Sequence, residues 1–404
     1  MSRLNDLIKE LCPNGVEYKT ILECLSQPIT DGPHETPKLV NDGIPFISVE
    51  AIHDGIIDLN KCRGYITKEY DEVCSKKYKP QKGDVYFVKS ASLGKVAMVT
   101  DDSDFNIWSP LAAMRCNTKI MLPRFLFHIL QTSRIQEEAK IQASTGSQPN
   151  LSMRKLEKFV IAVPPLEIQE EIVRILDKFG ELESELESEL EARKSQYEFW
   201  RGKLLNQKNE IKKLSDVSDV IDSLHATPQY VENGYPMIRV ADVKGGIVNT
   251  TDALRVDAET YNKFISKYKP QKGDIIISRV GSFGNVCIVG DEDICLGQNT
   301  SVIHPKIDDK YLYYYLSSDN VQDWIKNNVN GAGYKSLSLA NINEIPIAVP
   351  SIEEQKRVAN ILDKFDKLVN DITVGLPAEI ELRRKQYEYY RNKLLSFEEL
   401  SVSE

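Results

Sequence analysis

Two long segments of this chain keep apolar residues at helical spacing, and each is far longer than an ordinary globular helix. The first follows Val163-Pro164 and ends near Leu205. Spacings of three and four residues, or sums of the two, place side chains on one stripe of a helix. The first stripe consists of Ile172, Ile175, Phe179, Leu182, Leu186, Leu190, Tyr197, Trp200 and Leu204. A narrow stripe of this length requires a second helix opposite it.

The second long segment follows Val349-Pro350 and supplies the candidate partner helix. Its stripe consists of Val358, Ile361, Phe365, Leu368, Ile372, Ile380, Tyr387, Tyr390 and Leu394. Parallel pairing would require the intervening chain to travel back along the whole helix, whereas antiparallel pairing would not. We therefore expect a long antiparallel two-helix coiled coil of roughly 58 Å, at about 1.5 Å per residue.

The rest of the chain is duplicated together with these helices. The heptapeptide Tyr-Lys-Pro-Gln-Lys-Gly-Asp occurs at 78–84 and again at 268–274. The pattern Ser-x-Gly-x-Val at 92–96 returns at 282–286, with the same shift. A fixed shift over several motifs indicates a tandem repeat of one globular domain plus one long helix.

The first copy is typical of a mixed α/β domain. Short β-rich runs at 44–49, 84–89 and 95–99 alternate with a predicted helix at 123–140. We expect domains at 1–164 and 208–350 and long helices at 165–207 and 351–396, with the copies related by a pseudo-two-fold axis.

The second long helix contains a breakpoint in its sequence pattern at Gly375-Leu376-Pro377, where proline opposes a continuous helix. The stretch from Val349 to Arg383 is longer than the matching stretch from Val163 to Arg193, by four positions. The extra residues either bulge out, leaving the helices equal in length, or lengthen one helix.

Composition indicates an ordinary soluble globular chain. It has 404 residues, of which 41% are hydrophobic and 27% charged. There is no run of about 18 apolar residues, so we expect no membrane span, and the first residues lack the apolar core of a signal peptide. Seven cysteines without C-x-x-C spacing favour neither disulfides nor zinc. These features predict a cytoplasmic location.

No catalytic pattern stands out. The histidines lack metal-ligand spacing, and Gly-x-Ser-x-Gly is absent. We therefore expect no catalytic, metal or cofactor site in this chain, and a binding function instead.

Charge is distributed unevenly. The net charge of -9 argues against nucleic acid only as an average over all faces. Alternate residues from Glu181 to Glu191 are acidic, whereas lysines gather between Lys76 and Lys95. The acidic run is expected to be a solvated helix face; a basic partner surface is the alternative.

Polar residues on two matching turns and their neighbouring loops are the candidate contacts with DNA. Such donors can reach base edges or phosphates, and Gln and Asn suit adenine; ordinary turn polarity is the alternative. The candidates are Ser90, Ser92, Lys95, Gln148, Asn150, Arg279, Ser282, Asn285, Gln298, Asn299, Tyr334 and Lys335.

Loops differ more between copies than the scaffold does. Residues 31–34 read Asp-Gly-Pro-His, whereas 222–225 read Asp-Ser-Leu-His. A constant shift aligns Gln298 with Trp108 and Asn299 with Ser109, so contacts there cannot be transferred between copies. Different loops on one scaffold predict two sites that read different targets.

The duplicated order resembles the specificity (S) subunits of type I restriction–modification enzymes. Cys12-Pro13-Asn14-Gly15, the paired Gly-Asp strand starts, and the Glu-x-Gln helix starts at 167–169 and 353–355 carry the resemblance. Both long helices also end in Gln-Tyr-Glu followed by Lys-Leu-Leu. The resemblance covers nearly the whole chain.

This resemblance implies a non-catalytic subunit that binds double-stranded DNA for host defence and DNA methylation. Each domain would read one half of a split site, and the coiled coil would dock two methyltransferase (modification) subunits. Restriction subunits would join as translocases. S-adenosylmethionine, ATP and Mg²⁺ would be bound by these partners. A second interpretation stays open: a coiled-coil adaptor whose two globular heads bind proteins rather than DNA.

Overall fold

The computed structural model describes residues 2–144, 149–207, 209–329, 335–371 and 373–400. The chain divides into two compact units. Unit 1 comprises residues 1–186 and 380–404, and unit 2 comprises residues 187–379. Each unit therefore contains one globular domain and parts of two long helices.

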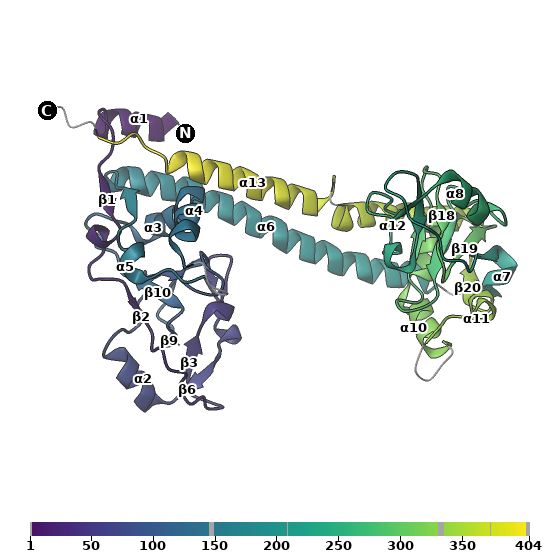
Figure 1. Cartoon of the computed structure of the whole chain (residues 1–404), viewed down its shortest axis with the longest axis horizontal. Coiled ribbons are helices and arrows are strands. Elements are labelled where there is room, and N and C mark those ends of the chain that lie inside the picture. Colours follow the sequence, from purple (N-terminus) through teal and green to yellow (C-terminus); the bar gives the residue numbers. More distant parts are fainter. Residues whose placement is uncertain (1, 145–148, 208, 330–334, 372, 401–404) are drawn as a thin grey trace. The chain divides into compact units, whose positions relative to one another are not determined.

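Unit 1 alternates short strands with helices, in the order seen along its chain in Figure 1. Its helices outside the long pair are α1 (Ser2–Leu11), α2 (Lys68–Ser75), α3 (Pro123–Leu130), α4 (Ser133–Gln142) and α5 (Met153–Leu156). Its strands are β1 (Tyr18–Thr20), β2 (Thr30–Asp31), β3 (Ile44–Ile47), β4 (Ile52–His53), β5 (Ile56–Ile57), β6 (Gly64–Ile66), β7 (Val85–Val88), β8 (Val96–Met98), β9 (Asn106–Ile107), β10 (Leu111–Met114) and β11 (Val160–Ala162). Three short 3₁₀ helices complete it: η1 (Leu22–Cys24), η2 (Val49–Ala51) and η3 (Leu59–Lys61).

Unit 2 repeats this order. Its helices are α7 (Leu214–Val217), α8 (Ala258–Ile265), α9 (Asp309–Leu316), α10 (Asp319–Asn327), α11 (Leu339–Asn343) and α12 (Ile352–Asn370), with the 3₁₀ helix η4 (Val240–Asp242). Its strands are β12 (Glu210–Lys213), β13 (Ser218–Asp222), β14 (Tyr235–Ile238), β15 (Arg255–Val256), β16 (Ile275–Ser278), β17 (Val286–Ile288), β18 (Cys295–Leu296), β19 (Thr300–Pro305) and β20 (Pro346–Val349).

The two units share their sheet topology. A four-stranded antiparallel sheet has the order β2-β10-β7-β8 in unit 1 and β13-β19-β16-β17 in unit 2. A three-stranded sheet with one parallel pair follows the same rule, as β6-β3-β9 and β15-β14-β18. The predicted mixed α/β class and the tandem duplication are confirmed.

The repeated heptapeptide forms the entrance to the central strand of each four-stranded sheet. Gly83 and Gly273 have φ of 92° and 87°, which an L side chain rarely adopts. The following aspartates, Asp84 and Asp274, are 1% exposed and accept hydrogen bonds from the tyrosine that opens the motif, at 2.7 and 2.8 Å. The motif thus stabilises the scaffold, because a buried carboxylate needs such donors.

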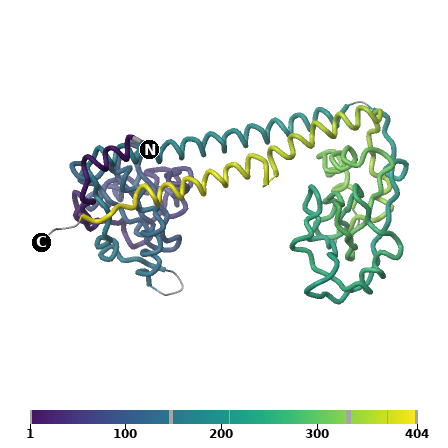
Figure 2. Tube along the Cα trace, turned by 90° about the horizontal axis from the view of Figure 1, so that it is seen from above, coloured from purple at the N-terminus to yellow at the C-terminus, as the bar shows by residue number. Residues whose placement is uncertain are grey.

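The first long helix, α6, is a single helix from Leu166 to Leu205. In unit 1 it packs antiparallel to α13 (Leu376–Leu394): Phe179 stacks on Tyr387 and Tyr390, and Arg384 Nε donates to Glu183 at 2.6 Å. The two helices run side by side in the ribbon of Figure 1 and in the Cα tube of Figure 2. In unit 2 the ring of Tyr197 on α6 lies 6.2 Å from that of Phe365 on α12.

The apolar stripes are only partly buried. Leu182 and Leu368 are both 37% exposed, and Ile372 lies outside the described residues. Most other stripe residues pack into the cores of their units. The periodicity placed the helices correctly but treated the stripe as more continuous than the packing is.

The second long helix is interrupted, as proline and glycine predict. α12 ends at Asn370 and α13 begins at Leu376. Asp371 Oδ1 accepts hydrogen bonds from the backbone N–H groups of Thr373 and Val374. A Cβ on Gly375 would lie only 2.4–2.9 Å from three backbone carbonyl oxygens. These contacts describe a compact local turn.

The predicted single helix at 123–140 is wrong, because the structure has two helices there. α3 ends at Leu130, and α4 starts at Ser133 after Thr132 in an extended conformation. Gln136 Nε2 donates to the carbonyls of Leu130 and Gly94, at 2.6 and 2.9 Å. A side chain that satisfies a free helix-end carbonyl stabilises this corner.

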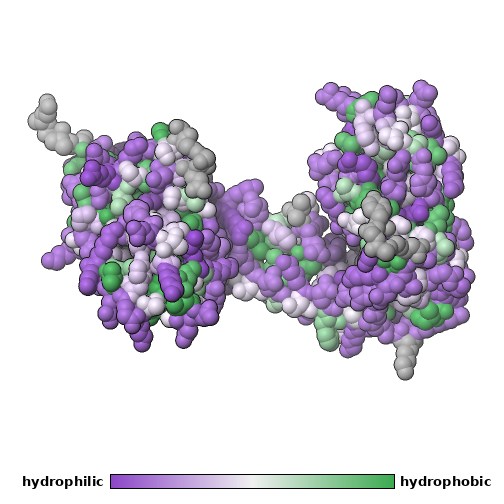
Figure 3. Space-filling model, turned by 60° about the horizontal axis from the view of Figure 1, so that its bottom comes forward, coloured by the Kyte–Doolittle hydropathy of each residue, from purple (hydrophilic) through white to green (hydrophobic). Residues whose placement is uncertain are grey.

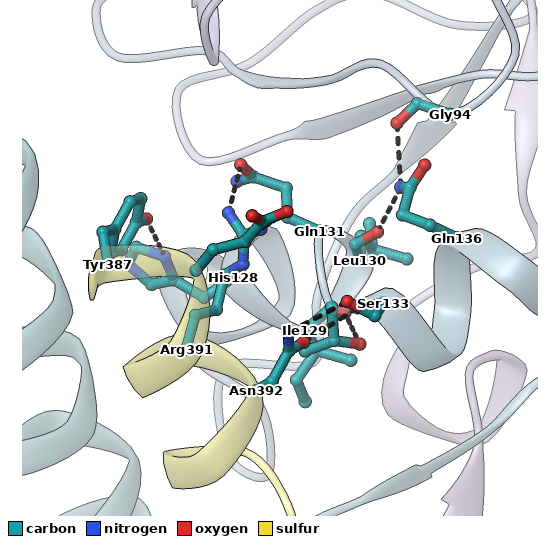
Figure 4. A network of polar contacts seen from close by, with 12 residues as sticks. Gly94, His128, Ile129, Leu130, Gln131, Ser133, Gln136, Tyr387, Arg391 and Asn392 are labelled. Carbon is teal, nitrogen blue, oxygen red and sulfur yellow. Dashed lines mark hydrogen bonds and ion pairs between the residues drawn. The ribbon is translucent and has the colours of Figure 1, made fainter. Parts of the chain in front are cut away.

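A buried polar network fixes the domain of unit 1 to its long helices (Figure 4). His128 on α3 is 0% exposed; its Nε2 lies 2.9 Å from Asp177 Oδ1 on α6, and its Nδ1 lies 3.1 Å from the hydroxyl of Tyr387 on α13. Arg391 Nη1 donates to Gln131 Oε1 at 3.3 Å. Burial lowers the pKa of His128 despite its contact with Asp177.

Unit 2 has the same junction with different side chains. Tyr314 on α9 donates its hydroxyl to Asp363 Oδ1 at 2.8 Å, and Lys310 pairs with the same carboxylate. Arg201, the equivalent of Arg391, donates to the backbone carbonyl of Ser317, the equivalent of Gln131. In both units the arginine Nε is buried without a partner among the described residues.

The acidic run on α6 is largely paired within the chain. Glu181, Glu189 and Glu191 form ion pairs with Lys178, Arg193 and Lys194 on α6 itself. Glu183 pairs with Arg384. This pattern matches the expected solvated face.

All seven cysteines are free thiols. Within the part of the chain that the structure describes, no helix is long and apolar enough to cross a membrane.

Candidate nucleic-acid interface

The two predicted turns have the same backbone geometry. Ala91 and Gly281 have φ of 62° and 72°, and Gly94 and Gly284 have φ of 97° and 85°. The N–H of Gly94 donates to the carbonyl of Val88 at 2.9 Å, and that of Gly284 donates to the carbonyl of Ser278 at 2.8 Å. The carbonyls of the same two glycines accept from Gln136 and Gln322 on the neighbouring helices, at 2.9 and 3.0 Å. These bonds hold the turns in place.

The candidate side chains on these turns point to solvent or into shallow hollows. Ser92, Lys95, Ser282 and Asn285 are exposed, and Ser90 is half-buried. Lys95 Nζ donates to the carbonyl of Ile52 at 3.1 Å. In unit 2 the equivalent residue is Asn285, whose Nδ2 lies 3.4 Å from the carbonyl of Val243. Its side chain therefore has the same orientation as that of Lys95.

The second set of loops lies next to these turns in both units. Ser90 forms an isolated β-bridge with Asn150, and Val280 forms one with Ser336. Asn150 and Lys335 are exposed, whereas Gln148 and Tyr334 lie outside the described residues. The structure therefore brings together, within each unit, two segments distant in the chain that the sequence could only match by position.

The side chain of Arg279 is half-buried and held by contacts within unit 2. Its guanidinium pairs through Nη1 with Asp222, and its Nε donates to the carbonyl of Leu337 at 3.1 Å. Its backbone N–H donates to the carbonyl of Asn299 at 2.8 Å. It thereby links β13, the turn and both loops, and this positioning role was not foreseen.

Gln298 is exposed and Asn299 is half-buried with φ of 65°. Gln298 Nε2 lies 3.5 Å from the hydroxyl of Thr227, a weak contact that leaves the amide accessible.

The sequence alignment of this segment is wrong by one residue. The N–H of Trp108 donates to the carbonyl of Ile47, and the equivalent donor in unit 2 is Gly297, which bonds to Ile238. The N–H of Lys89 donates to Pro110, whereas that of Arg279 donates to Asn299. Gln298 therefore matches Ser109, and Asn299 matches Pro110. From β8 to β9 the chain is one residue longer than from β17 to β18.

Each unit also contains a charge cluster that sequence reasoning missed. In unit 1, Asp31 is 1% exposed, and Lys77 donates to its Oδ1 at 2.6 Å. Lys89 and His34 form ion pairs with its Oδ2 at 3.3 and 3.2 Å, but Oδ2 accepts no hydrogen bond from the described residues. In unit 2, Asp222 pairs with Arg279 and receives His225 Nε2 at 3.0 Å and the hydroxyl of Ser301 at 3.1 Å. Burial would raise the pKa of Asp222, but bonds from Arg279 and His225 outweigh it and hold the pKa below its ordinary value.

A signal for these clusters was present in loops that were interpreted as different. Asp31 and His34 keep the three-residue spacing of Asp222 and His225, and Lys89 matches Arg279 by the same shift that relates the two heptapeptides. The loop interiors differ, but their charged ends are the same.

Comparisons with known proteins agree with this duplicated architecture. The profile of the "type I restriction modification DNA specificity domain" family matches residues 33–192 and again residues 206–382. The chain belongs to the family of type I restriction–modification specificity (S) subunits.

Relatives span much of this S-family chain. A putative type I restriction enzyme specificity subunit of Haemophilus influenzae is 34% identical over 293 residues, which cover 68% of this chain and 72% of the relative. A type I restriction enzyme specificity subunit of Escherichia coli is 36% identical over 246 residues, covering 57% of this chain and 60% of the relative.

Solved structures share the S-subunit fold. A chain from an assembled type I restriction–modification system has a TM-score of 0.60 at 18% identity, covering 95% of this chain and 98% of that one. The specificity subunit of M. genitalium has a TM-score of 0.55 at 16% identity, covering 94% and 96%.

The described residues of this S-family chain contain no group of three or more His, Cys, Asp or Glu side chains that could hold a metal ion. The visible faces of the two units are predominantly hydrophilic, with scattered apolar residues (Figure 3).

Proposed function

We infer that this chain reads a two-part DNA sequence, one half with each globular domain, and catalyses no reaction itself. The observation that carries this inference is the duplicated pairing of turn and loop, held by matching hydrogen bonds but bearing different side chains. Equal scaffolds position two reading surfaces equally, and unequal side chains make their targets differ.

Exchange of one domain tests this function. The full chain, produced with its modification subunits, is compared with a chimera whose residues 15–150 come from a relative. Methylated sites are then mapped across a genome. We expect one half-site to change and the other to stay. A simultaneous change of both halves would contradict independent reading, and the absence of any sequence-specific methylation or binding would favour a protein-binding adaptor.

The long helices are proposed to set the spacer between the half-sites. α6 is continuous, whereas the second long helix is interrupted between Asn370 and Leu376. The interruption favours the bulge over a lengthened helix. Deleting four residues there should leave the spacer unchanged, whereas adding four residues to both helices at matched positions adds about 6 Å, nearly two base-pair steps of about 3.4 Å. An unchanged spacer after the double insertion would rule out a ruler.

Two modification subunits are proposed to dock on equivalent helix faces. Phe199 and Tyr389 occupy matching positions of the two copies and are 64% and 59% exposed. Lys203 lies 5.9 Å from the first ring and Lys393 lies 5.7 Å from the second. Repeated aromatic and cationic pairs suit two copies of one partner, since aromatic residues often anchor interfaces. The Phe199→Ala and Tyr389→Ala variants should each lose one modification subunit by native mass measurement.

The remaining components are proposed to act from partner chains. S-adenosylmethionine would be bound by the modification subunits, and ATP and Mg²⁺ by restriction subunits. Purified full chain alone should then bind none of the three in calorimetric titrations, and clear binding of any would contradict this division.

A further inference from the structure

Beside the reading loops of unit 2 lies a pocket of about 340 Å³. Its polar wall includes Asp222, Ser223, His225 and Lys267, and its apolar wall includes Phe264 and Leu296. Asp222 ends β13, and Leu296 ends β18 two residues before Gln298. The pocket therefore adjoins the candidate base-reading residues.

Two hydrogen-bond donors of this pocket are uncommitted. Lys267 is exposed and makes no hydrogen bond or ion pair with any described residue. Ser223 is only 9% exposed, and its buried hydroxyl has no partner in the described part of the chain. His225 donates Nε2–H to Asp222, and its other ring nitrogen is an acceptor in the neutral imidazole, so it offers an anion no donor.

The one acid in this wall is already neutralised. Asp222 receives Arg279, His225 and Ser301, so its charge is compensated and its oxygens are largely occupied. Lys267 then leaves one net positive charge. A buried hydroxyl without a partner costs free energy that a ligand oxygen would recover. The complement of this wall is an anion with several acceptor oxygens.

We propose that this pocket binds a backbone phosphate of the DNA half-site that unit 2 reads, through Lys267 and Ser223. The assignment rests on the proposed function. Phosphate contacts fix the register of a protein on the duplex, so a contact beside Gln298 would orient that side chain toward its base. Arg279 and His225 hold Asp222, and none of these three side chains touches the ligand.

Unit 1 provides a matched control. Lys77 occupies the position equivalent to Lys267, but its ammonium lies 2.6 Å from Asp31 Oδ1. Lys89 and His34 contact the same buried carboxylate. Gly32 stands where unit 2 has Ser223, so residues 31–34 carry no hydroxyl. The unit 1 cluster is therefore closed on its own acid, and the unit 2 cluster is open.

The test uses the full chain in complex with its modification subunits, bound to a duplex that carries the recognised site. Affinity is measured between about 50 mM and about 200 mM salt, where one lost phosphate contact lowers the salt slope by about 0.9. For Lys267→Ala we expect that loss, equal on all sequences, with binding weakened roughly fourfold or more at the low-salt end. Lys77→Ala should leave the slope unchanged.

Two further measurements identify the ligand. Ser223→Ala should weaken binding without changing the slope, because a hydroxyl displaces no counterion. Replacing single phosphates of the duplex by uncharged methylphosphonates should reveal one position whose loss has no effect in Lys267→Ala. Titrating inorganic phosphate into the same complex tests whether the pocket binds free phosphate instead of DNA.

The outcomes are distinct. An unchanged salt slope in Lys267→Ala, with wild-type complex binding normally, overturns the phosphate contact while leaving the proposed function intact. Tight inorganic phosphate binding with an unchanged DNA slope assigns the pocket to a free anion and overturns the DNA assignment. A wild-type complex without sequence-specific DNA binding overturns both.

Discussion

The contact between each globular domain and its long helices uses the same acceptor, an aspartate, but a different aromatic donor. On α6 of unit 1, Asp177 accepts from His128 and Arg124. On α12 of unit 2, Asp363 accepts from Tyr314 and pairs with Lys310. The carboxylate, its place on the helix and the cation beside it are kept, whereas the buried aromatic donor changes from imidazole to phenol.

The turns and loops that carry the candidate DNA contacts show the same relation more strongly. Backbone hydrogen bonds around the turns match from one unit to the other, yet Ser90, Lys95 and Ser109 in unit 1 stand where Val280, Asn285 and Gln298 stand in unit 2. These scaffold bonds join backbone groups, so they persist when the side chains change. Surface donors are free to vary, and we propose that they carry sequence readout.

Removing the junction donors should have the largest effect on stability. Tyr314→Ala loses a buried ring and leaves Asp363 with one donor fewer, so we expect a loss of roughly 3–5 kcal/mol. His128→Ala should cost about 2–4 kcal/mol by the same mechanisms. Urea unfolding measures the total, and hydrogen exchange locates the loosened helix.

Tyr314→Phe is the matched control for the ring. It removes only the hydroxyl and should cost roughly 1–2 kcal/mol. If Tyr314→Phe were as damaging as Tyr314→Ala, the hydrogen bond and not the packing would dominate. If exchange rose in α3 after a change at Tyr314, the junctions would not be independent.

A glycine lies in a crowded turn of the second long helix, whereas a glycine in α6 lies in open helix, and this difference gives a second test. Gly375→Ala brings a Cβ within 2.4–2.9 Å of the carbonyls of Lys367, Leu368 and Asp371, so we expect a loss of about 1–3 kcal/mol. Gly180→Ala, inside continuous α6, meets nothing within 4 Å and should stabilise by roughly 0.5–1 kcal/mol. Thermal unfolding compares them. A neutral Gly375→Ala would mean that the turn rearranges freely.

Sequence periodicity and repetition predicted the long helices, their break at Gly375 and the Gly-Asp strand entrances, because each depends on neighbouring residues. The Asp31 and Asp222 clusters were missed since key partners, Lys77 and Ser301, are distant from these aspartates in the chain. Only the folded sheet brings Lys77, Lys89 and His34 to one carboxylate.

The misalignment of Gln298 has a different cause. One residue fewer between β17 and β18 shifts every later position in the unit 2 sheet, and a loop residue can be omitted without a trace in hydrophobic pattern. The roles of individual reading residues stay predictions, because base contacts depend on loop geometry and on the duplex.

Gln298 and Lys95 separate reading from general attraction. Gln298→Ala should relax specificity at one base pair by about 1–3 kcal/mol, because a bidentate amide contact is lost. Lys95→Ala should weaken binding on all sequences and lower the salt slope by about one unit. Binding to a panel of single-base variants measures both. Asn285→Ala, at the position equivalent to Lys95, removes an uncharged side chain and should leave the slope unchanged.

The last expected effect concerns acid. Burial lowers the pKa of His128 from its ordinary value of 6.5. Arg124, Asp177, Tyr387 and Arg391 surround it on three helices. The unfolded chain therefore binds this proton more readily than the folded chain. The stability that His128 contributes is complete above about pH 6.5 and declines as pH falls below it, by about 1.4 kcal/mol for each pH unit until the lowered pKa is reached.

The corresponding group in unit 2 does not titrate in this range, because burial raises the pKa of Tyr314 above its ordinary value of 10.0. His128→Tyr transfers that donor to unit 1, where Asp177 replaces Asp363 as its acceptor. We expect stability near that of the parent at about pH 7.5 and a smaller loss on moving to about pH 5.5. Urea midpoints at both pH values decide it. An identical decline in parent and variant would assign the acid sensitivity to groups outside this junction. Asp177 itself responds only in more acidic solution, because donors from His128 and Arg124 outweigh its burial and lower its pKa from 3.8.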